Sequence, residues 1–220
     1  MALQKNDVIE FSYTGRFKTG ELFDTTDEEL AKKENLWNSE MKYGTKMCIL
    51  GKETFLKGLE ESLIGKELGA HKIELEAKKA FGVPDAKLRQ LVPTGQFTKQ
   101  NIRPRPGLQV NIDGAIGVVR TVSGGRTLID FNHPFAGKDV VYDVEVKKVI
   151  TGAKEKAEAF LSIIGMEATA QLEGDSIVIK TKKNLGKEGE EFIKNEIKEL
   201  TGKSANINVE KEEKEKQVTA

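Results

Sequence analysis

The stretch TFLKGLEESLIGK, residues 54–66, has the spacing of a short helix. Phe55, Leu59 and Leu63 recur every four residues, so they lie on one face of a helix. Gly65 follows them and readily takes the left-handed conformation that ends helices. The segment therefore predicts one short amphipathic helix that packs against the strands on either side of it in the sequence.

Strands are predicted on both sides of this helix. Apolar and polar residues alternate in DVIEFSYTG (7–15), HKIELEA (71–77) and DVVYDVEVKKV (139–149). Such alternation places the apolar side chains on one face of a strand. The apolar set is Ile9, Phe11, Tyr13, Ile73, Leu75, Val140, Tyr142, Val144 and Val146. We predict half-buried strands, of which residues 139–149 form the clearest central one.

Residues 83–130 have a different character. They hold four of the five prolines and seven Lys or Arg against three Asp or Glu. Three β-like runs, LQVNI (108–112), AIGVVRTV (115–122) and TLIDF (127–131), are separated by the turn signals DG and SGG. This composition predicts an inserted, β-rich and locally cationic subdomain.

After Ile150 the pattern changes again. GAKEKAEAFLSIIG (152–165) and GKEGEEFIKNEIKEL (186–200) predict two helices, MEATAQLEGDSIVIKT (166–181) a hairpin around Gly174 and Asp175, and ANINVE (205–210) a last strand. The final stretch, EKEEKEKQVTA (210–220), is highly charged without apolar spacing, which predicts a solvated tail. Residues 151–220 therefore read as a small α+β unit.

The overall composition excludes several classes of protein. The 220 residues carry 35 basic and 35 acidic side chains, so no global field favours nucleic acid or an anionic membrane. The twelve basic residues from position 151 onward are matched by fourteen acidic ones. A single cysteine, Cys48, excludes an internal disulfide framework and is expected to be a small buried residue in a reducing cytosol. We predict a soluble cytoplasmic protein with neither a membrane nor a nucleic-acid partner.

The usual catalytic motifs are missing. The sequence has no G-x-S-x-G, no Gly-rich phosphate loop ending in Lys-Ser or Lys-Thr, and no Cys-x-x-Cys. Its two histidines, His71 and His133, lie far apart in the sequence, so we expect no metal site and no cofactor. His133 alone leaves three interpretations open, a catalytic base, a metal ligand or part of a turn, and the neighbouring Asn132 and Pro134 favour the turn.

Apolar and aromatic residues instead gather where the predicted elements begin and end. They are Tyr13, Phe23 beside Asp24, Phe55, Leu56, Leu59, Phe81 and Tyr142. Plain core packing explains such residues equally well on composition alone. Their local motifs are more specific than their composition.

Three stretches carry a resemblance to a known family. FSYTGRFKTGELFDTT (11–26), ILGKETFLKGLEESLIGKELGAHKIELEAKKAFG (49–82) and NHPFAGKDVVYDVEVKKV (132–149) follow one another in this order. Residues 7–150 resemble the FKBP-type peptidyl-prolyl cis/trans isomerases, and the insertion resembles the insert-in-flap domain of the SlyD subgroup. The C-terminal unit is similar to the extension of the long archaeal members.

The resemblance implies an α+β fold, in which an antiparallel sheet wraps on one short helix. It implies an isomerase domain at 1–82 and 131–150, an insert-in-flap chaperone domain at 83–130, and a C-terminal α+β domain at 151–220. The role of this last domain stays open between dimerisation, client binding and capping of the isomerase domain.

The resemblance also implies an activity, the isomerisation of X-Pro bonds in unfolded or partly folded client proteins. Asp24 would polarise the site near the rotating carbonyl, and Leu59, where the family often has Trp, would form a roomier floor. Phe55 and Leu56 would present backbone and side chain to the substrate. The aromatic walls would be Tyr13, Phe23, Phe81 and Tyr142.

The apolar residues of the insertion admit two interpretations, a small core or a shallow groove for extended chains. They are Leu91, Val92, Phe97, Ile102, Leu108 and Val110. We favour the groove because so small a unit buries its surface inefficiently, and because of the resemblance. The competing function is a non-catalytic holdase or a metal-handling protein on the same scaffold. The metal version is disfavoured because residues 210–220 contain neither His nor Cys.

Overall fold

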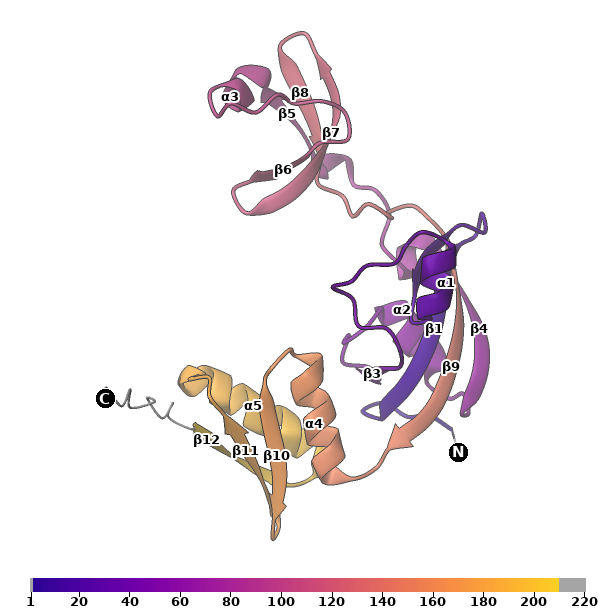
Figure 1. The fold of residues 1–220 in the computed structure, drawn as a ribbon, viewed down its shortest axis with the longest axis vertical. Coiled ribbons are helices and arrows are strands. Elements are labelled where there is room, and N and C mark those ends of the chain that lie inside the picture. Colours follow the sequence, from indigo (N-terminus) through magenta and orange to yellow (C-terminus); the bar gives the residue numbers. More distant parts are fainter. Residues whose placement is uncertain (1, 210–220) are drawn as a thin grey trace, which may run out of the picture. The chain divides into compact units, whose positions relative to one another are not determined.

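The computed structural model describes residues 2–209, and the predicted charged tail lies outside this range. The chain divides into two compact units (Figure 1). Residues up to 73 together with those from 141 onward form the first unit, and residues 74–140 form the second. The prediction of a mixed α+β fold built on antiparallel sheets is confirmed.

The first unit contains a five-stranded sheet, called here the first sheet, in the order β2-β1-β9-β4 with β3 also paired to β1. Its strands β1 and β2 are antiparallel, as are β1 and β3. The bounds are β1 (Val8–Phe17), β2 (Leu22–Thr25), β3 (Lys46–Ile49), β4 (Gly69–Leu75) and β9 (Val140–Ile150). The strands predicted from alternation correspond to β1, β4 and β9, whereas β2 and β3 are too short to show a pattern.

Two helices accompany this sheet, α1 (Glu28–Lys33) and α2 (Lys57–Leu63). Helix α2 buries Leu59 and Leu63, and Gly65 beyond it has a left-handed φ of 86°. Phe55 was expected on the same helical face, but the helix begins two residues later. Phe55 therefore sits in the loop before α2, half-buried.

The second unit holds a four-stranded antiparallel sheet in the order β5-β8-β7-β6. The elements are 3₁₀ helices at Ala77–Lys79 and Ala86–Leu88, then β5 (Arg89–Pro93), α3 (Thr94–Thr98), β6 (Gln109–Ile112), β7 (Ala115–Ser123) and β8 (Arg126–Asp130). Tight turns join the last three strands, and both Asp113–Gly114 and Gly124–Gly125 have positive φ values. Such turns match the twist of a hairpin and need residues that tolerate this conformation.

The C-terminal part of the first unit is a three-stranded sheet with two helices. Its elements are α4 (Ala153–Ile163), β10 (Ala168–Glu173), β11 (Ser176–Thr181), α5 (Gly186–Thr201) and β12 (Ser204–Val209). Strands β10 and β11 form an antiparallel hairpin through Gly174 and Asp175, and α5 returns the chain so that β12 runs parallel to β11.

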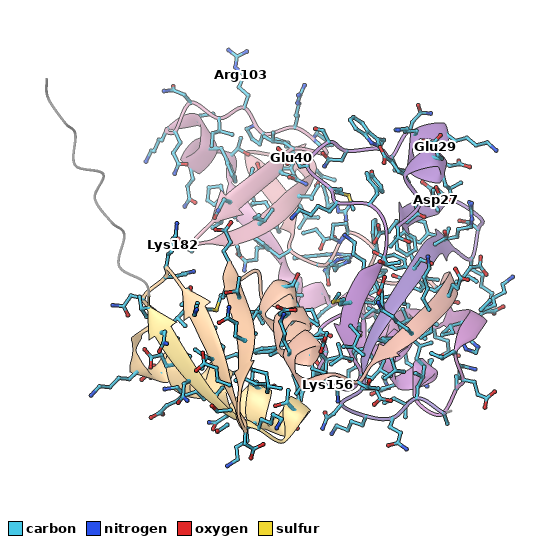
Figure 2. All side chains as sticks on the ribbon, turned by 60° about the horizontal axis from the view of Figure 1, so that its bottom comes forward. Asp27, Glu29, Glu40, Arg103, Lys156 and Lys182 are labelled. Carbon is cyan, nitrogen blue, oxygen red and sulfur yellow. The ribbon has the colours of Figure 1, made fainter. Side chains whose placement is uncertain are left out.

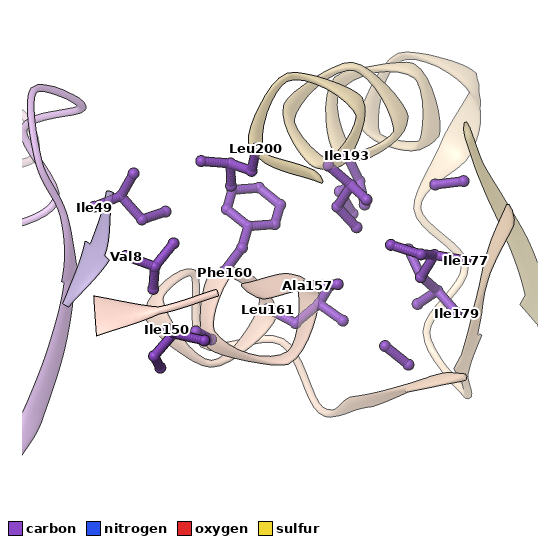
Figure 3. Packing of buried hydrophobic residues seen from close by; sticks show 14 residues of the cluster. Val8, Ile49, Ile150, Ala157, Phe160, Leu161, Ile177, Ile179, Ile193 and Leu200 are labelled. Atoms are coloured by element: carbon purple, nitrogen blue, oxygen red, sulfur yellow. The ribbon is translucent and has the colours of Figure 1, made fainter. Parts of the chain in front are cut away.

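A shared hydrophobic core joins this C-terminal part to the first sheet. Val8, Ile49 and Ile150 pack in one cluster with Ala157 and Phe160 (Figure 3). Val8 and Ile9 are adjacent in β1 and both fully buried, so this strand is covered on both faces. The core of the C-terminal helices is therefore continuous with one side of the first sheet.

Polar contacts reinforce the same junction. The Lys52 ammonium lies 3.2 Å from the Glu196 carboxylate and 2.6 Å from that of Glu199, both on α5. The Asn6 amide also donates to Glu199 at 3.2 Å. These contacts tie the loop after β3 and the segment before β1 to α5.

Candidate active site

An aromatic cluster lines one side of the first sheet. The ring of Tyr13 on β1 lies 4.9 Å from Phe55 and 5.9 Å from Tyr142 on β9, measured between centroids. Phe23 on β2 meets Tyr142 edge-on at 5.7 Å. These distances and tilted angles are those of favourable aromatic pairs. Four of the aromatic residues singled out in the sequence thus form one contiguous cluster.

Two further aromatics support this cluster from behind. Phe11 lies 5.4 Å from Phe55, and Phe17 lies 4.7 Å from Phe23. Both are buried, so they hold the rings that they contact. Sequence reasoning treated Phe11 as a core residue and did not single out Phe17.

Asp24 is the carboxylate of this site. Its Oδ2 accepts a hydrogen bond of 2.7 Å from the Tyr13 hydroxyl. The pairing of β1 with β2 brings the two side chains together, since Gly15 is opposite Asp24 and Thr14 opposite Thr25. The backbone of Tyr13 is held in turn, because its N–H donates to the Thr26 hydroxyl at 2.9 Å.

Both tyrosines of the cluster stay protonated. Burial raises the pKa of Tyr13, and the adjacent Asp24 charge and hydrogen bond raise it further. Burial also raises the pKa of Tyr142, with a second contribution from the Asp24 charge. Among residues 2–209 the Tyr142 hydroxyl has no hydrogen-bond partner. The site therefore holds a neutral O–H donor that no other group of residues 2–209 accepts.

A buried glutamate shapes the loop that carries Phe55. Glu60 on α2 is 1% exposed, and its two carboxylate oxygens accept backbone hydrogen bonds from Gly51, Glu53 and Phe55 at 2.9, 3.0 and 2.7 Å. Such a carboxylate satisfies three donors that would otherwise be unpaired. Glu60 was not among the predicted site residues, because its partners are backbone groups.

Leu59 and Leu56 occupy the start of α2. Leu59 is 1% exposed, as a floor residue would be, and Leu56 is half-buried at the N-cap position. Within the described chain, the Leu56 N–H donates to no other group, whereas its carbonyl accepts from Leu59 and Glu60. An unpaired N–H at this place is available to an incoming carbonyl.

A side chain at position 15 would clash with the aromatic cluster, and the residue there is Gly15. A Cβ at this position would lie 2.8 Å from the Phe23 ring and 2.9 Å from the Tyr142 ring. Real Cβ atoms do not approach other atoms so closely, so the glycine lets both rings pack against the backbone of β1.

Phe81, the remaining predicted wall residue, belongs to the second unit. Its ring stacks on His133 with centroids 4.7 Å apart and planes within 2°, and Phe135 packs edge-on at 5.3 Å. The His133 Nδ1 accepts the Phe135 N–H at 3.2 Å, which is the geometry of a turn. Within the described residues, no three His, Cys, Asp or Glu side chains are grouped to hold a metal ion.

The six apolar residues predicted to bind substrate in the second unit differ in exposure. Phe97 and Val110 are buried at 6% and 7% and form its core with Val119 and Ile129. Val92, Ile102 and Leu108 pack partly buried against them. Leu91 is 60% exposed. Phe97 and Val110 therefore belong to the core of this unit and are not purely surface residues.

A groove nevertheless opens over this small core. A cavity of about 260 Å³ is lined by Val92, Phe97, Ile102, Val110 and Ile112, with polar residues between them. The two interpretations of these residues are thus not exclusive, because the edges of core side chains form the groove wall.

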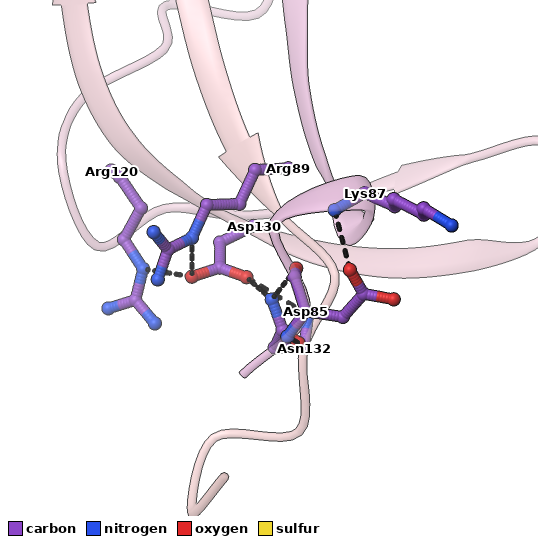
Figure 4. Close-up of polar contacts among 6 residues, drawn as sticks. All are labelled: Asp85, Lys87, Arg89, Arg120, Asp130 and Asn132. Atoms are coloured by element: carbon purple, nitrogen blue, oxygen red, sulfur yellow. Dashed lines mark hydrogen bonds and ion pairs between the residues drawn. The ribbon is translucent and has the colours of Figure 1, made fainter. Parts of the chain in front are cut away.

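A polar network closes the base of the second unit (Figure 4). Asp130 is 4% exposed and pairs with Arg120 and Arg89, whose Nε atoms lie 3.1 and 3.4 Å away. Its other oxygen accepts two hydrogen bonds from Asn132, which also accepts from the Asp85 N–H at 2.7 Å. The segment before β5 is thereby bonded to the segment after β8.

The same network sets the charge state of Asp130. Burial of the carboxyl opposes ionisation, but the hydrogen bonds from Asn132 and the Arg120 charge outweigh it. Together they hold the pKa of Asp130 below its usual value.

A family model and several known proteins match this chain. Residues 90–135 match the model of the family described as FKBP26, IF domain. The chain is 36% identical over 106 residues to the FKBP-type 16 kDa peptidyl-prolyl cis-trans isomerase of Escherichia coli (strain K12), covering 46% of this chain and 70% of that protein. This chain belongs to the family of FKBP-type peptidyl-prolyl cis-trans isomerases, a family of enzymes.

Two further relatives extend the similarity beyond that region. A short-type peptidyl-prolyl cis-trans isomerase of Methanocaldococcus jannaschii is 28% identical over 148 residues, which span 67% of this chain and 94% of the relative. The SlyD isomerase of Treponema pallidum is 26% identical over 166 residues, 73% of this chain and 86% of the relative. No helix in residues 2–209 has the length and apolar character needed to span a membrane.

Proposed function

We propose that this chain catalyses cis/trans isomerisation of X-Pro bonds in unfolded or partly folded polypeptides. The observation that carries the proposal is the cluster of Tyr13, Phe55 and Tyr142 around the Tyr13–Asp24 hydrogen bond. Proline packs well on aromatic rings, and the free Tyr142 hydroxyl offers a donor to the carbonyl beside it.

The reaction needs no nucleophile. Rotation of a peptide bond costs about 18–20 kcal/mol because the planar form has C–N double-bond character. Uncatalysed X-Pro exchange takes roughly tens to hundreds of seconds. A factor of about 10⁴–10⁵ brings this to milliseconds and corresponds to roughly 5–7 kcal/mol. Shape and hydrogen bonding at one apolar site are adequate for a barrier reduction of this size.

The named groups divide this task. The planar amide is more charge-separated than the twisted one, so an apolar cluster penalises the ground state more than the transition state. The Leu56 N–H would anchor a carbonyl of the substrate chain. The Tyr142 O–H would donate to a second carbonyl, and Asp24 would hold Tyr13 in place while presenting its charge beside the rotating bond.

We assign client capture to an insert-in-flap domain at 83–130, flanked by an isomerase domain at 1–82 and 131–150 and followed by a C-terminal domain at 151–220. The groove over Val92, Phe97 and Ile102 supports this assignment, since it offers apolar wall without a closed cavity. On the opposite sheet face Leu91 and Ile116 are 60% and 68% exposed. Capture would raise the local concentration of X-Pro bonds near the isomerase site. The buried Cys48 thiol, whose pKa burial raises to about 12, suits a reducing cytoplasm.

Two substrates separate the two activities. A protease-coupled assay on a short X-Pro peptide measures the isomerase site alone, and refolding of a protein limited by an X-Pro step measures both domains. Residues 89–130 can be replaced by a short Gly-Ser turn, because the Phe131 N–H already bonds to the Leu88 carbonyl at 2.9 Å.

The replacement should leave peptide turnover nearly unchanged and sharply reduce the refolding rate. Asp24→Ala should reduce both. Equal losses on both substrates after the replacement would refute the division of labour. Suppression of aggregation without any effect on the slow refolding phase would instead favour the holdase.

A further inference from the structure

A second pocket lies beside α1 and shares no lining residue with the aromatic cluster already described. It is lined by the side chains of Trp37, Met41 and Tyr43 from the loop after α1, and by acidic residues at the start of that helix. Its volume is about 540 Å³, within the range of about 300–1,000 Å³ typical of ligand pockets. We call it the Trp37 pocket.

The aromatic side of the Trp37 pocket is open to solvent. Trp37 is 47% exposed and Met41 42%, and neighbouring Leu36 is 40% exposed. Large apolar side chains that are exposed together on a surface commonly mark an interaction site. Trp37 is also the only tryptophan in the chain.

The loop that carries these residues is held by hydrogen bonds. The Asn38 N–H donates to the Tyr43 hydroxyl at 3.0 Å, and the Glu40 N–H donates to the Asn38 side chain at 2.9 Å. At the end of the loop, the Gly44 N–H donates to the Thr26 carbonyl at 2.8 Å. The pocket is therefore preformed, which lowers the entropic cost of binding.

The other side of the Trp37 pocket is acidic. Asp27, Glu28 and Glu29 line it, and Asp27 and Glu29 are seen at the start of α1 in Figure 2. Glu28 accepts a hydrogen bond of 3.3 Å from the Trp37 indole, which fixes a carboxylate at the edge of the ring. The Lys32 ammonium pairs with Glu28 and Glu29 from the next turn of the helix but does not line the pocket.

The charge of the pocket selects its occupant. Among the described residues, three carboxylates and no Lys or Arg line it. An aromatic face beside carboxylates attracts a cation, because the ring quadrupole and the negative charges act in the same direction. A purely apolar ligand would desolvate these carboxylates without bringing them a positive charge.

We propose that the Trp37 pocket binds Lys- or Arg-containing apolar segments of unfolded client chains, with the cation over the Trp37 ring and its apolar neighbours against Met41. The proposal rests on the proposed function, because it gives the isomerase domain a client contact of its own. Residues 83–130 carry an excess of four positive charges and should favour acidic segments. The two surfaces would then select client segments of opposite charge.

Trp37 fluorescence tests the proposal in the full-length protein. The probe is a short proline-free peptide that alternates Lys with Leu, and the matched control peptide has Glu in place of Lys. The Lys peptide should shift the Trp37 emission to shorter wavelength with saturation, and added salt should weaken it. The Glu peptide should cause no saturable shift. Equal binding of both peptides would overturn the proposal.

Variants locate the binding by a second readout, the anisotropy of a labelled Lys peptide. Trp37→Ala and the double change Glu28→Gln with Glu29→Gln should each weaken binding on the order of tenfold. Met41→Lys, which puts a cation into the pocket, should do the same without removing the aromatic ring. Matched controls on α5 are Phe192→Ala, an equally exposed aromatic, and Glu190→Gln with Glu191→Gln. Wild-type affinity for the Lys peptide in all three pocket variants would refute the proposal.

The same variants separate this proposal from the proposed function. Glu28 and Glu29 take no part in the isomerase site, so their replacement should leave turnover of a short X-Pro peptide unchanged. A protein that binds the Lys peptide as predicted but turns over no X-Pro peptide would refute the isomerase assignment alone.

Discussion

Replacement of Glu60 tests how the loop before α2 is built. Its buried carboxylate is the acceptor for the backbone N–H groups of Gly51, Glu53 and Phe55. Glu60→Ala leaves all three part-buried donors without this acceptor. Glu60→Gln keeps one carbonyl oxygen but turns an NH₂ group toward N–H donors.

The cost follows from the number of unpaired groups. A fully buried donor left without a partner costs about 1–3 kcal/mol. These three donors are only part-buried, so Glu60→Ala should lower the free energy of unfolding by about 3–6 kcal/mol, the lower part of the range for three such groups. Glu60→Gln should lower it by about 1–3 kcal/mol. These are large fractions of the roughly 5–15 kcal/mol by which proteins are stable. Phe55 also loses its anchor, so kcat/KM should fall even where the protein is still folded.

Urea unfolding followed by Trp37 fluorescence measures this effect, because Trp37 reports on the unit that contains Glu60. The control is Glu61→Gln, a change of an exposed neighbour on the same helix. A Glu60→Ala variant within about 0.5 kcal/mol of wild type, the usual range of neutral surface changes, would refute the reasoning.

Three further predictions concern other parts of the molecule. Phe160→Ala should lower the free energy of unfolding by about 3–5 kcal/mol, measured by urea titration of the first unit, and an unchanged midpoint would contradict the shared core. Gly15→Ala should push Phe23 and Tyr142 apart, raise KM for a short X-Pro peptide and lower the free energy of unfolding by about 1–3 kcal/mol; an unchanged KM would show that the rings can shift freely. Because the folded pKa of Asp130 is depressed, its stabilising effect is present above the unfolded carboxyl pKa of about 4 and is lost as pH falls through the folded value. Acid titration should therefore destabilise the second unit less in Asp130→Asn than in wild type, and parallel curves would contradict this account.

The strands with clear alternation could be predicted from the sequence, and the short elements could not. Strand β9 shows an apolar residue at every second position from Val140 to Val146, which only a strand explains. Strand β5 ends at Pro93 and is largely exposed, so it shows no periodic burial. Its place in the sheet comes from pairing with β8, which is a tertiary effect.

The candidate site shows the same division. Tyr13, Asp24 and Tyr142 lie in motifs that can be recognised from the sequence alone. The role of Glu60 could not be predicted from the sequence, because it depends on the path of the loop from Gly51 to Phe55. The adjacent pair Val8 and Ile9 was an available signal that β1 is covered on both faces, since strict alternation would place a polar residue at one of the two.

The most direct test of the account is the turnover of a short X-Pro peptide by the intact wild-type chain and by Tyr142→Phe. The wild type should accelerate exchange well above the uncatalysed rate. Tyr142→Phe removes only the hydroxyl, so it should lower kcat/KM on the order of tenfold while the unfolding free energy stays within about 1 kcal/mol of wild type. A folded wild-type chain that leaves the exchange rate at its uncatalysed value would contradict the central claim.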